Sequence, residues 1–406
     1  MSNNYYDYII VGGGIVGLAT AYKLQLKFPD KSIAVLEKED VIGKHQTGRN
    51  SGVMHSGIYY KPGSFKALNC KNGHQQLIAF AKENNIKHDV CGKIIVATNE
   101  SEIPLLEMIY QRGVENGTQG ISYLNEQQIK EREPFINGVK AIHVPTAGII
   151  DFVEVCKKFV EIIHQLNPKS KLITSCEVVK INSSSYEKEV ITSLGAFKAK
   201  TLIFCGGLQS DRLAVLDKVT LDLQIVGFRG DYFELTDVAK HKIKHLVYPV
   251  PDPNFPFLGV HFTRMIDDSI ECGPNAVFSF KREGYSRTSF SLKDTWQALT
   301  FSGTWKMFFK HWRKGLDEYH RAFSRVAFVK ALQKLMPSIT VDDVQPARAG
   351  VRAQAIENNG DLVDDFKIYK HNGNIHVLNA PSPAATACLA IADEIVLEVL
   401  KANTIL

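Results

Sequence analysis

The sequence lacks the features that mark a disulfide-rich, zinc-binding or membrane-spanning protein. Its seven cysteines are odd in number and widely spaced, and no Cys-x-x-Cys pair occurs, which speaks against a disulfide framework and a zinc site. No run of about 18 uninterrupted apolar residues is present, so we expect no transmembrane helix. The short polar stretch before the first apolar run predicts no signal or transit peptide. We therefore expect a reducing, cytoplasmic location and no bound metal.

An excess of charge of one sign is also absent. The net charge is +5 in 406 residues, and basic and aromatic residues form no nucleic-acid-reading motif, so we expect no nucleic-acid partner. The chain shows neither an internal repeat nor a low-complexity linker. Because 406 residues exceed the size of one simple core, two domains are expected.

Residues 8–17 form a glycine-rich motif that follows an apolar strand and opens a helix. Gly12, Gly14 and Gly17 have G-x-G-x-x-G spacing, and the next apolar run ends at Glu37. In this context the first glycine permits a tight turn, the second lets a pyrophosphate approach the backbone, and the third lets helix and strand pack closely. The helix N-terminus offers N–H groups to phosphates, and Glu37 is placed to bind a ribose. The motif predicts a dinucleotide site.

Similar strand-turn-helix patterns recur far apart in the chain. After the start they appear in the middle, where a strand is predicted over 171–181, and at the end, where a helix is predicted over 384–400. This spacing predicts a discontinuous cofactor domain with a second domain inserted in two pieces. The cofactor domain is assigned to residues 1–85, 145–218 and 340–406, and the second domain to 86–144 and 219–339 with a helical segment over 293–335.

Three further blocks carry a resemblance to a known family. Residues 43–60, 349–354 and 379–386 resemble the L-2-hydroxyglutarate oxidase/dehydrogenase family of the FAD-dependent D-amino-acid-oxidase-like superfamily. The resemblance implies an α/β Rossmann-like FAD domain and an α+β, mostly antiparallel substrate domain. It also implies oxidation of L-2-hydroxyglutarate, a small dicarboxylate hydroxy acid, to 2-oxoglutarate. A hydride would pass to flavin N5 and the electrons onward to a quinone or oxygen.

The motif and the resemblance together predict the residues that contact FAD. They come from the glycine turn, from Glu37 and the residue after it, and from the 47–51 loop. Others come from a central strand, from the glycine pair after the strand that ends near residue 205, and from the 349–354 and 379–386 blocks. The N–H groups of that last block, at a helix start, would stabilise reduced flavin. The predicted contacts are Gly12, Gly14, Ile15, Gly17, Glu37, Lys38, Thr47, Arg49, Asn50, Ser51, Val178, Gly206, Gly350, Pro381, Ser382, Pro383, Ala384, Ala385 and Thr386.

Two histidines are candidates for the base that takes the hydroxyl proton. A general base with a pKa near neutrality assists hydride transfer from an alcohol, and histidine is the natural choice. His55 follows the glycine-rich loop, and His261 lies in a Gly-Val-His-Phe-Thr-Arg stretch. Either one is also explained as a hydrogen-bonded structural residue, or His55 as a flavin contact, so the choice stays open.

The two carboxylates of the substrate call for arginine and tyrosine partners. Arginine binds a carboxylate with two parallel hydrogen bonds, which lysine cannot do. Arg352 and Arg264 are the candidates, and Tyr59, Tyr60 and Tyr248 can donate to the distal carboxylate. For each arginine a surface ion pair is the alternative.

One aromatic segment predicts a location for the enzyme. All three tryptophans fall within 296–319, where aromatic and leucine side chains recur at helical spacing among lysines and arginines. Such a basic amphipathic helix can lie in a membrane interface and bring the flavin to its quinone. The alternative is a helix that packs its aromatic face on the substrate domain.

Other functions remain open at this point. A relative that oxidises an amine or amino acid would need no strong base, so its histidines would matter less. A non-catalytic flavin-binding protein is a second alternative, and an NAD-dependent dehydrogenase is a third.

Overall fold

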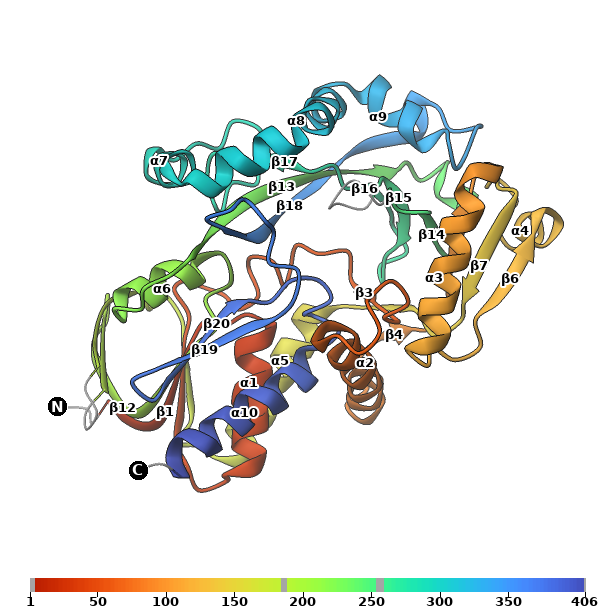
Figure 1. Cartoon of the computed structure of the whole chain (residues 1–406). Coiled ribbons are helices and arrows are strands. Elements are labelled where there is room, and N and C mark those ends of the chain that lie inside the picture. The colour runs from red at the N-terminus through yellow and green to blue at the C-terminus, as the bar shows by residue number, and fades with distance from the viewer. Residues whose placement is uncertain (1–3, 184–187, 253–258, 405–406) are drawn as a thin grey trace.

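The computed structural model describes residues 4–183, 188–252 and 259–404. Within these residues it contains two large β-sheets and a small third one, and the two large sheets lie in different halves of the molecule (Figure 1).

The first large sheet carries the glycine motif. Its order is β10-β11-β12-β1-β2-β9, with β20 beside β12 and β19 beside β20. The central pairs β12–β1, β1–β2 and β2–β9 are parallel, and residues 8–11 of β1 are all buried, as expected for a strand covered on both faces. The strands are β1 (Tyr5–Val11), β2 (Ile33–Leu36), β9 (Lys171–Ile173), β10 (Val178–Ser183), β11 (Lys188–Thr192), β12 (Gly195–Phe204), β19 (Lys367–His371) and β20 (Asn374–Asn379).

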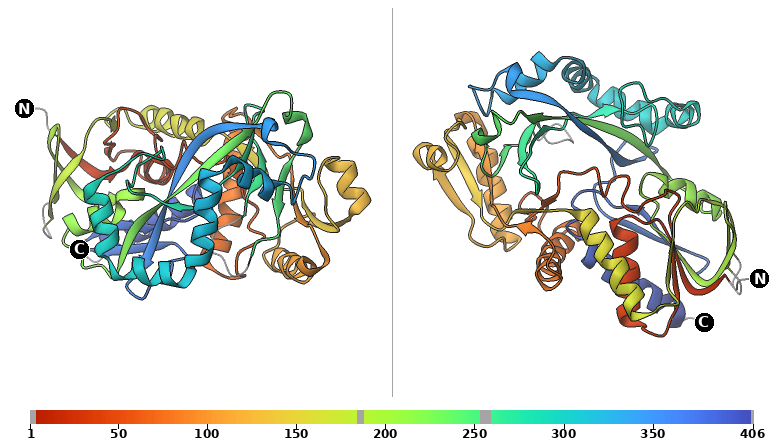
Figure 2. Two further views of the ribbon diagram at one scale, coloured as in Figure 1. Left: turned by 90° about the horizontal axis from the view of Figure 1, so that it is seen from above. Right: turned by 180° about the vertical axis from the view of Figure 1, so that it is seen from behind.

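Helices from distant parts of the chain cover one face of this sheet. α1, α5 and α10 lie side by side there, with α2 next to them (Figure 2). Their apolar faces form one core with the sheet, which includes Leu18, Phe159 and Ile391. The helices are α1 (Ile15–Lys27), α2 (Phe65–Glu83), α5 (Phe152–Leu166) and α10 (Cys388–Thr404).

The second large sheet is mostly antiparallel. Its order is β17-β13-β16-β15-β14-β5-β7-β6, with β18 beside β13, and the β14–β5 pair is parallel. The strands are β5 (Lys93–Ala97), β6 (Ser122–Asn125), β7 (Lys140–Val144), β13 (Leu223–Leu235), β14 (Leu246–Pro249), β15 (His261–Arg264), β16 (Ile270–Gly273), β17 (Val277–Phe278) and β18 (Val344–Glu357). A small sheet of β3 (Val53–Met54), β8 (Gly148–Ile150) and β4 (His88–Asp89) completes the set.

The remaining helices flank the second sheet or connect the halves. Figure 1 shows α7, α8 and α9 along the outer side of β13, β17 and β18. The helices outside the first layer are α3 (Ile103–Glu115), α4 (Glu126–Arg132), α6 (Ser210–Leu216), α7 (Leu292–Thr300), α8 (Ser302–Phe323) and α9 (Arg325–Leu332). Short 3₁₀ turns are η1 (Glu100–Glu102), η2 (Gly207–Gln209), η3 (Lys240–Lys242) and η4 (Val341–Asp343).

The predicted fold class, a Rossmann-like domain with a mostly antiparallel second domain, is confirmed. The residue limits of the two domains stay a prediction.

Two predicted elements differ from the structure. The strand expected over 171–181 is divided into β9 and β10, because Ser175 has a φ of +52° and the backbone N–H of Cys176 bonds to the carbonyl of Glu37. The helix expected from Ala384 begins at Cys388. Residues 382–387 form turns instead, in which the Thr386 hydroxyl donates to a carbonyl of β3.

The aromatic face expected on 296–319 is only partly exposed. Phe308 and Tyr319 pack into the core around Phe278, whereas Phe309 and Trp312 are exposed. Helix α8 bends at His311, whose φ and ψ are −123° and 18°. The bend turns the later residues relative to the earlier ones, which a single helical period does not anticipate.

Candidate active site

One cavity of about 1410 Å³ runs from the glycine turn to the second sheet. It is larger than the roughly 300–1,000 Å³ typical of small-ligand pockets, as a dinucleotide with a substrate beside it requires. Its lining comes from the β1–α1 turn, the 43–55 loop, β13, β18 and the turns before α10.

The glycine turn leaves room where a pyrophosphate would lie. Gly12 has a φ of +116°, and a Cβ there would lie 2.3 Å from the Cys205 carbonyl oxygen. A Cβ on Gly17 would lie 2.1 Å from the Gly12 carbonyl oxygen, so helix and strand pack closely, as predicted. Gly14 is the N-cap residue of α1 and has no side chain that could cap the helix. The nearest atom to a Cβ at this position would be Thr47 Oγ1 at 3.4 Å. The Ile15 N–H at the start of α1 donates to the Thr47 hydroxyl at 3.0 Å, and Gly14, Ile15 and Thr47 all line the cavity.

The acid after β2 is buried and held by backbone donors. Glu37 lines the cavity, its Oε2 accepts a hydrogen bond from the Gly13 N–H at 2.7 Å, and its Oε1 accepts one from the Glu39 N–H at 2.9 Å. Each carboxylate oxygen has a further lone pair for a ribose hydroxyl. The observed cradle thus fits an adenosine dinucleotide.

The 43–52 loop joins the cradle to the second sheet. Arg348 on β18 donates to the carbonyl of Gly48 at 2.8 Å, and Arg49 donates to the carbonyl of Ala349 at 3.2 Å. A Cβ on Gly350 would lie 2.5 Å from the Arg49 carbonyl oxygen, so this position requires the close backbone approach that glycine allows.

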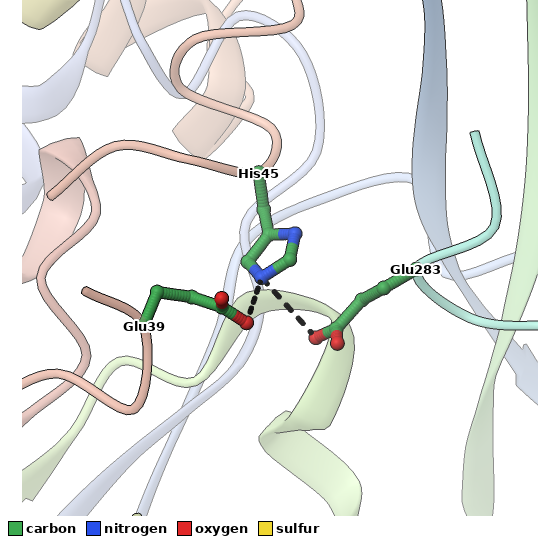
Figure 3. A group of neighbouring side chains, drawn as sticks. All are labelled: Glu39, His45 and Glu283. Carbon is green, nitrogen blue, oxygen red and sulfur yellow. Dashed lines mark hydrogen bonds and ion pairs between the residues drawn. The ribbon is translucent and has the colours of Figure 1, made fainter. Parts of the chain in front are cut away.

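A cluster of charged side chains lies at the nucleotide end of the cavity (Figure 3). His45 Nε2 is 2.9 Å from Glu39 and 3.7 Å from Glu283. These three groups have the spacing of metal ligands, yet the Lys38 ammonium bonds to both carboxylates and Lys44 bonds to Glu39. The hydrogen bond from Lys38 is the main cause that lowers the pKa of Glu39 to about 2. We interpret the cluster as an ion-pair network that ties the loop after β2 to the segment after β17.

The far end of the cavity brings together residues predicted to act on the substrate, and Tyr60 is one of them. His55, His261, Tyr59, Tyr248 and Arg352 all line it, and the rings of Tyr248 and His261 stack with centroids 4.0 Å apart. Burial lowers the pKa of each histidine to about 3, with Lys93 or Arg352 adding to the shift, so both imidazoles are neutral at neutral pH. Neutral imidazoles can accept a proton, but these pKa values lie below the near-neutral value expected for the base, because burial disfavours the imidazolium form.

Most of the predicted cofactor residues also line this cavity, from the glycine turn through the Pro381–Thr386 block. Two predicted residues lie elsewhere. Arg264 bonds to Asp89 at 2.9 Å and to Asp268 at 3.1 Å and does not line the cavity. Gly17 serves the packing of α1 on β1 instead of the cavity wall.

The sequence analysis missed several residues near the substrate end. Lys66 and Tyr232 line the cavity, and Lys93 lies behind its wall. For Lys93 a signal was present, because a lysine that opens the run Lys-Ile-Ile-Val-Ala is attached to a strand that reads as fully buried. Lys66 gave no such signal, since it begins an ordinary amphipathic helix.

The parallel sheet, the glycine turn, the ribose acid and the histidine-lined end of one cavity define a dinucleotide-dependent oxidoreductase. The model of the family "FAD dependent oxidoreductase" matches residues 7–396. The L-2-hydroxyglutarate dehydrogenase of Indibacter alkaliphilus is 45% identical, over 95% of this chain and 96% of the relative. That of Escherichia coli K12 is 42% identical over 97% and 93%, and the mitochondrial one of Nematostella vectensis 44% over 96% and 89%. The chain therefore belongs to the FAD-dependent oxidoreductases and, within them, to the L-2-hydroxyglutarate dehydrogenase family.

Solved structures agree with this fold. L-α-glycerophosphate oxidase from Mycoplasma pneumoniae with FAD bound superposes with a TM-score of 0.79 at 24% identity, covering 98% of this chain and 95% of the other. Glycine oxidase from Geobacillus kaustophilus gives 0.72 at 17% identity, with coverage of 98% and 95%. FAD is the cofactor that the family and the cradle both require.

Proposed function

We propose that this chain oxidises L-2-hydroxyglutarate to 2-oxoglutarate with FAD as the hydride acceptor. The observation that carries the proposal is the single cavity that joins the glycine-turn cradle to an end lined by two neutral histidines, Arg352 and tyrosines. When bound, FAD would supply the acceptor for the hydride from the C2 carbon, and a histidine of this chain would take the hydroxyl proton. The names of the relatives support this substrate.

We infer that His261 is the base. Its Nδ1 lies 2.8 Å from the carbonyl oxygen of Gly259, which can only accept a hydrogen bond. The neutral ring therefore carries its proton on Nδ1, and Nε2 keeps the lone pair that can take the substrate proton.

His55 fits a different role. Its backbone N–H bonds to the Thr386 hydroxyl at 3.0 Å, which ties it to the turn before α10.

Arg352 and the tyrosines are assigned to the substrate carboxylates. Arg352 lines the cavity from β18 and presents a planar guanidinium suited to a carboxylate. The Tyr59 hydroxyl is buried and has no hydrogen-bond partner among the described residues. A buried hydroxyl without a partner is costly, so a ligand oxygen at this position would satisfy it.

Anaerobic addition of L-2-hydroxyglutarate is expected to bleach the flavin absorbance of the purified enzyme. A panel of amino acids is expected to leave the spectrum unchanged, because the site is arranged for a diacid and an alcohol proton. D-2-hydroxyglutarate is expected to do the same, because inversion at C2 would turn its C2 hydrogen away from the flavin when both carboxylates are bound. The measurement is a visible spectrum under nitrogen before and after each addition. Bleaching by an amino acid but not by the hydroxy acid would replace this proposal with an amino-acid oxidase.

We further propose that electrons leave to a quinone at a membrane surface. No helix among the described residues combines the length and apolarity needed to cross a bilayer. Helices α7 to α9 nevertheless present a band of exposed apolar side chains, which includes Trp296 at 68% exposure, Trp305, Phe309 at 74%, Trp312 and Leu316. Exposed aromatic side chains that are flanked by lysines along a helix favour a lipid interface.

The wild-type enzyme is expected to cosediment with anionic liposomes at low salt, and high salt is expected to release it. Since Phe309 and Trp312 are exposed, Phe309→Ser with Trp312→Ser should abolish binding without unfolding the protein. Val238→Ser, at an exposed apolar position near η3, is the matched control and should bind normally. The membrane proposal fails if the wild type remains in the supernatant with such liposomes at low salt.

A further inference from the structure

Lys93 is a buried lysine behind the wall of the substrate end. It is 1% exposed, at the first position of β5, and belongs to the largest fully buried side chains of the protein. Its Nζ lies 4.6 Å from the centroid of the Tyr59 ring and 4.9 Å from that of the Tyr248 ring. Both rings line the cavity, whereas Lys93 does not. The ammonium group is therefore separated from the cavity by the faces of two tyrosines.

The surroundings of Lys93 hold no compensating charge. Among the described residues, no carboxylate forms an ion pair with it, and the thiol of Cys70 on α2 is the group whose charge would favour the ammonium form. Burial raises the pKa of Cys70 to about 12, and it likewise raises the pKa values of Tyr59 and Tyr248. All three are therefore neutral near pH 7.

The other titratable groups within electrostatic reach are the two histidines of the site. The positive charge of Lys93 is one of the causes that lower the pKa values of His55 and His261, after burial. Both rings are neutral near pH 7, so Lys93 is the member of this set that changes charge there. Burial lowers the pKa of Lys93 itself to about 7. An isolated buried ammonium group is expensive unless an anion comes near it.

We propose that Lys93 is a positioning residue whose charge, held behind Tyr59 and Tyr248, makes the site select a doubly charged substrate over a singly charged one. This inference rests on the proposed function, because it concerns the same diacid site. The cation–π contacts hold the two rings in place, and the charge acts through them across a region of low dielectric. Arg352 and Lys66 line the cavity directly, so Lys93 adds a further, indirect source of positive potential.

The proposal predicts a definite sign for the pH dependence of binding. A dianion in the cavity favours the ammonium form, so binding raises the pKa of Lys93 and takes up a proton. Affinity is therefore highest below about pH 7 and falls as the pH rises above that value. The limiting slope is about tenfold per pH unit, until the pKa of the complex is reached. A monoanion raises that pKa less and shows a weaker dependence.

The test uses the FAD-loaded enzyme and two unreactive probes, glutarate and pentanoate, which differ by one carboxylate. Dissociation constants are measured from the flavin difference spectrum between pH 6 and 8.5, where glutarate is doubly ionised. We expect Lys93→Met to weaken glutarate binding at pH 6 by about tenfold or more and to remove the pH dependence. Pentanoate binding should change much less. Lys93→Arg should restore tight glutarate binding and keep it up to pH 8.5.

Lys188→Met is the matched control. Lys188 on β11 of the first sheet is also buried, and burial lowers its pKa to about 8. Its charge interacts with that of Asp217, and Lys188 does not line the cavity. This variant should bind glutarate as the wild type does. If Lys93→Met does not fold, proton uptake on glutarate binding by the wild type, from calorimetry in buffers of different ionisation enthalpy, serves as the second measurement.

The outcomes separate the two proposals. Wild-type affinity and wild-type pH dependence in Lys93→Met would overturn the role of Lys93 and leave the proposed function intact. The absence of proton uptake in the wild type would overturn it as well. Failure of the FAD-loaded wild type to bind glutarate at all would instead overturn the diacid site itself.

Discussion

Replacing Gly14 with alanine is expected to yield a folded protein that no longer retains FAD. The nearest atom to a Cβ at this position is Thr47 Oγ1 at 3.4 Å, and the backbone φ of −82° suits any residue, so the protein itself tolerates the methyl group. The methyl group would occupy the space in which the pyrophosphate approaches the backbone. We expect FAD affinity to fall by at least about a hundredfold, or roughly 3 kcal/mol. The flavin absorbance per protein and the far-ultraviolet circular dichroism measure the two effects separately.

Gly315→Ala is the control for this experiment. A Cβ at Gly315 meets no atom within 4 Å, and the residue lies inside α8, where alanine favours the helix over glycine by up to about 1 kcal/mol. This variant should remain yellow and be at least as stable as the wild type. Gly12→Ala is a poor test, because its Cβ would collide with the Cys205 carbonyl and disturb the fold. Full FAD retention by Gly14→Ala would mean that the cofactor lies elsewhere.

Replacing His261 with asparagine is expected to lower the rate of flavin reduction by about 10²- to 10⁴-fold while FAD stays bound. Asparagine still donates a hydrogen bond to the Gly259 carbonyl but offers no basic nitrogen to the substrate. Anaerobic stopped-flow spectroscopy with L-2-hydroxyglutarate gives the rate, and the flavin spectrum gives the occupancy. The dissociation constant of glutarate should change little, because the loss concerns proton removal.

His55→Asn provides the comparison. If His261 is the base, His55→Asn should have the smaller effect on the rate, and the bond from the backbone N–H of this position to Thr386 should remain. The reverse order of effects would transfer the role of base to His55. Equal, small effects in both variants would favour a substrate that needs no base, such as an amine.

The cofactor cradle was predictable because it depends on neighbours in the chain. The turn at Gly12, the start of α1 at Ile15 and the acid directly after β2 follow from glycine geometry and from short continuous apolar runs. The parallel order of β12, β1 and β2 and the mostly antiparallel second sheet agree with the predicted fold class.

Local rules failed where a distant segment decides the conformation. The division of the 171–181 strand depends on bonds to the loop after β2, and the late start of α10 depends on the contact of Thr386 with β3. The helical spacing of the aromatic residues in α8 predicted one exposed aromatic face. Part of that face, including Phe308 and Tyr319, packs into the core around Phe278 instead. In each case a contact between remote segments outweighs local propensity.

The sequence alone determined the class of protein, the dinucleotide cradle and the types of residue needed for hydride and proton transfer, because these depend on short motifs whose geometry is local. Tertiary structure decided which of those residues share one cavity. It brought His55, His261 and Arg352 together, paired Arg264 with acids elsewhere and placed Lys93 behind two tyrosines. The reason is physical: the strands that carry these side chains meet through sheet pairing and burial, and no spacing along the chain encodes those distances.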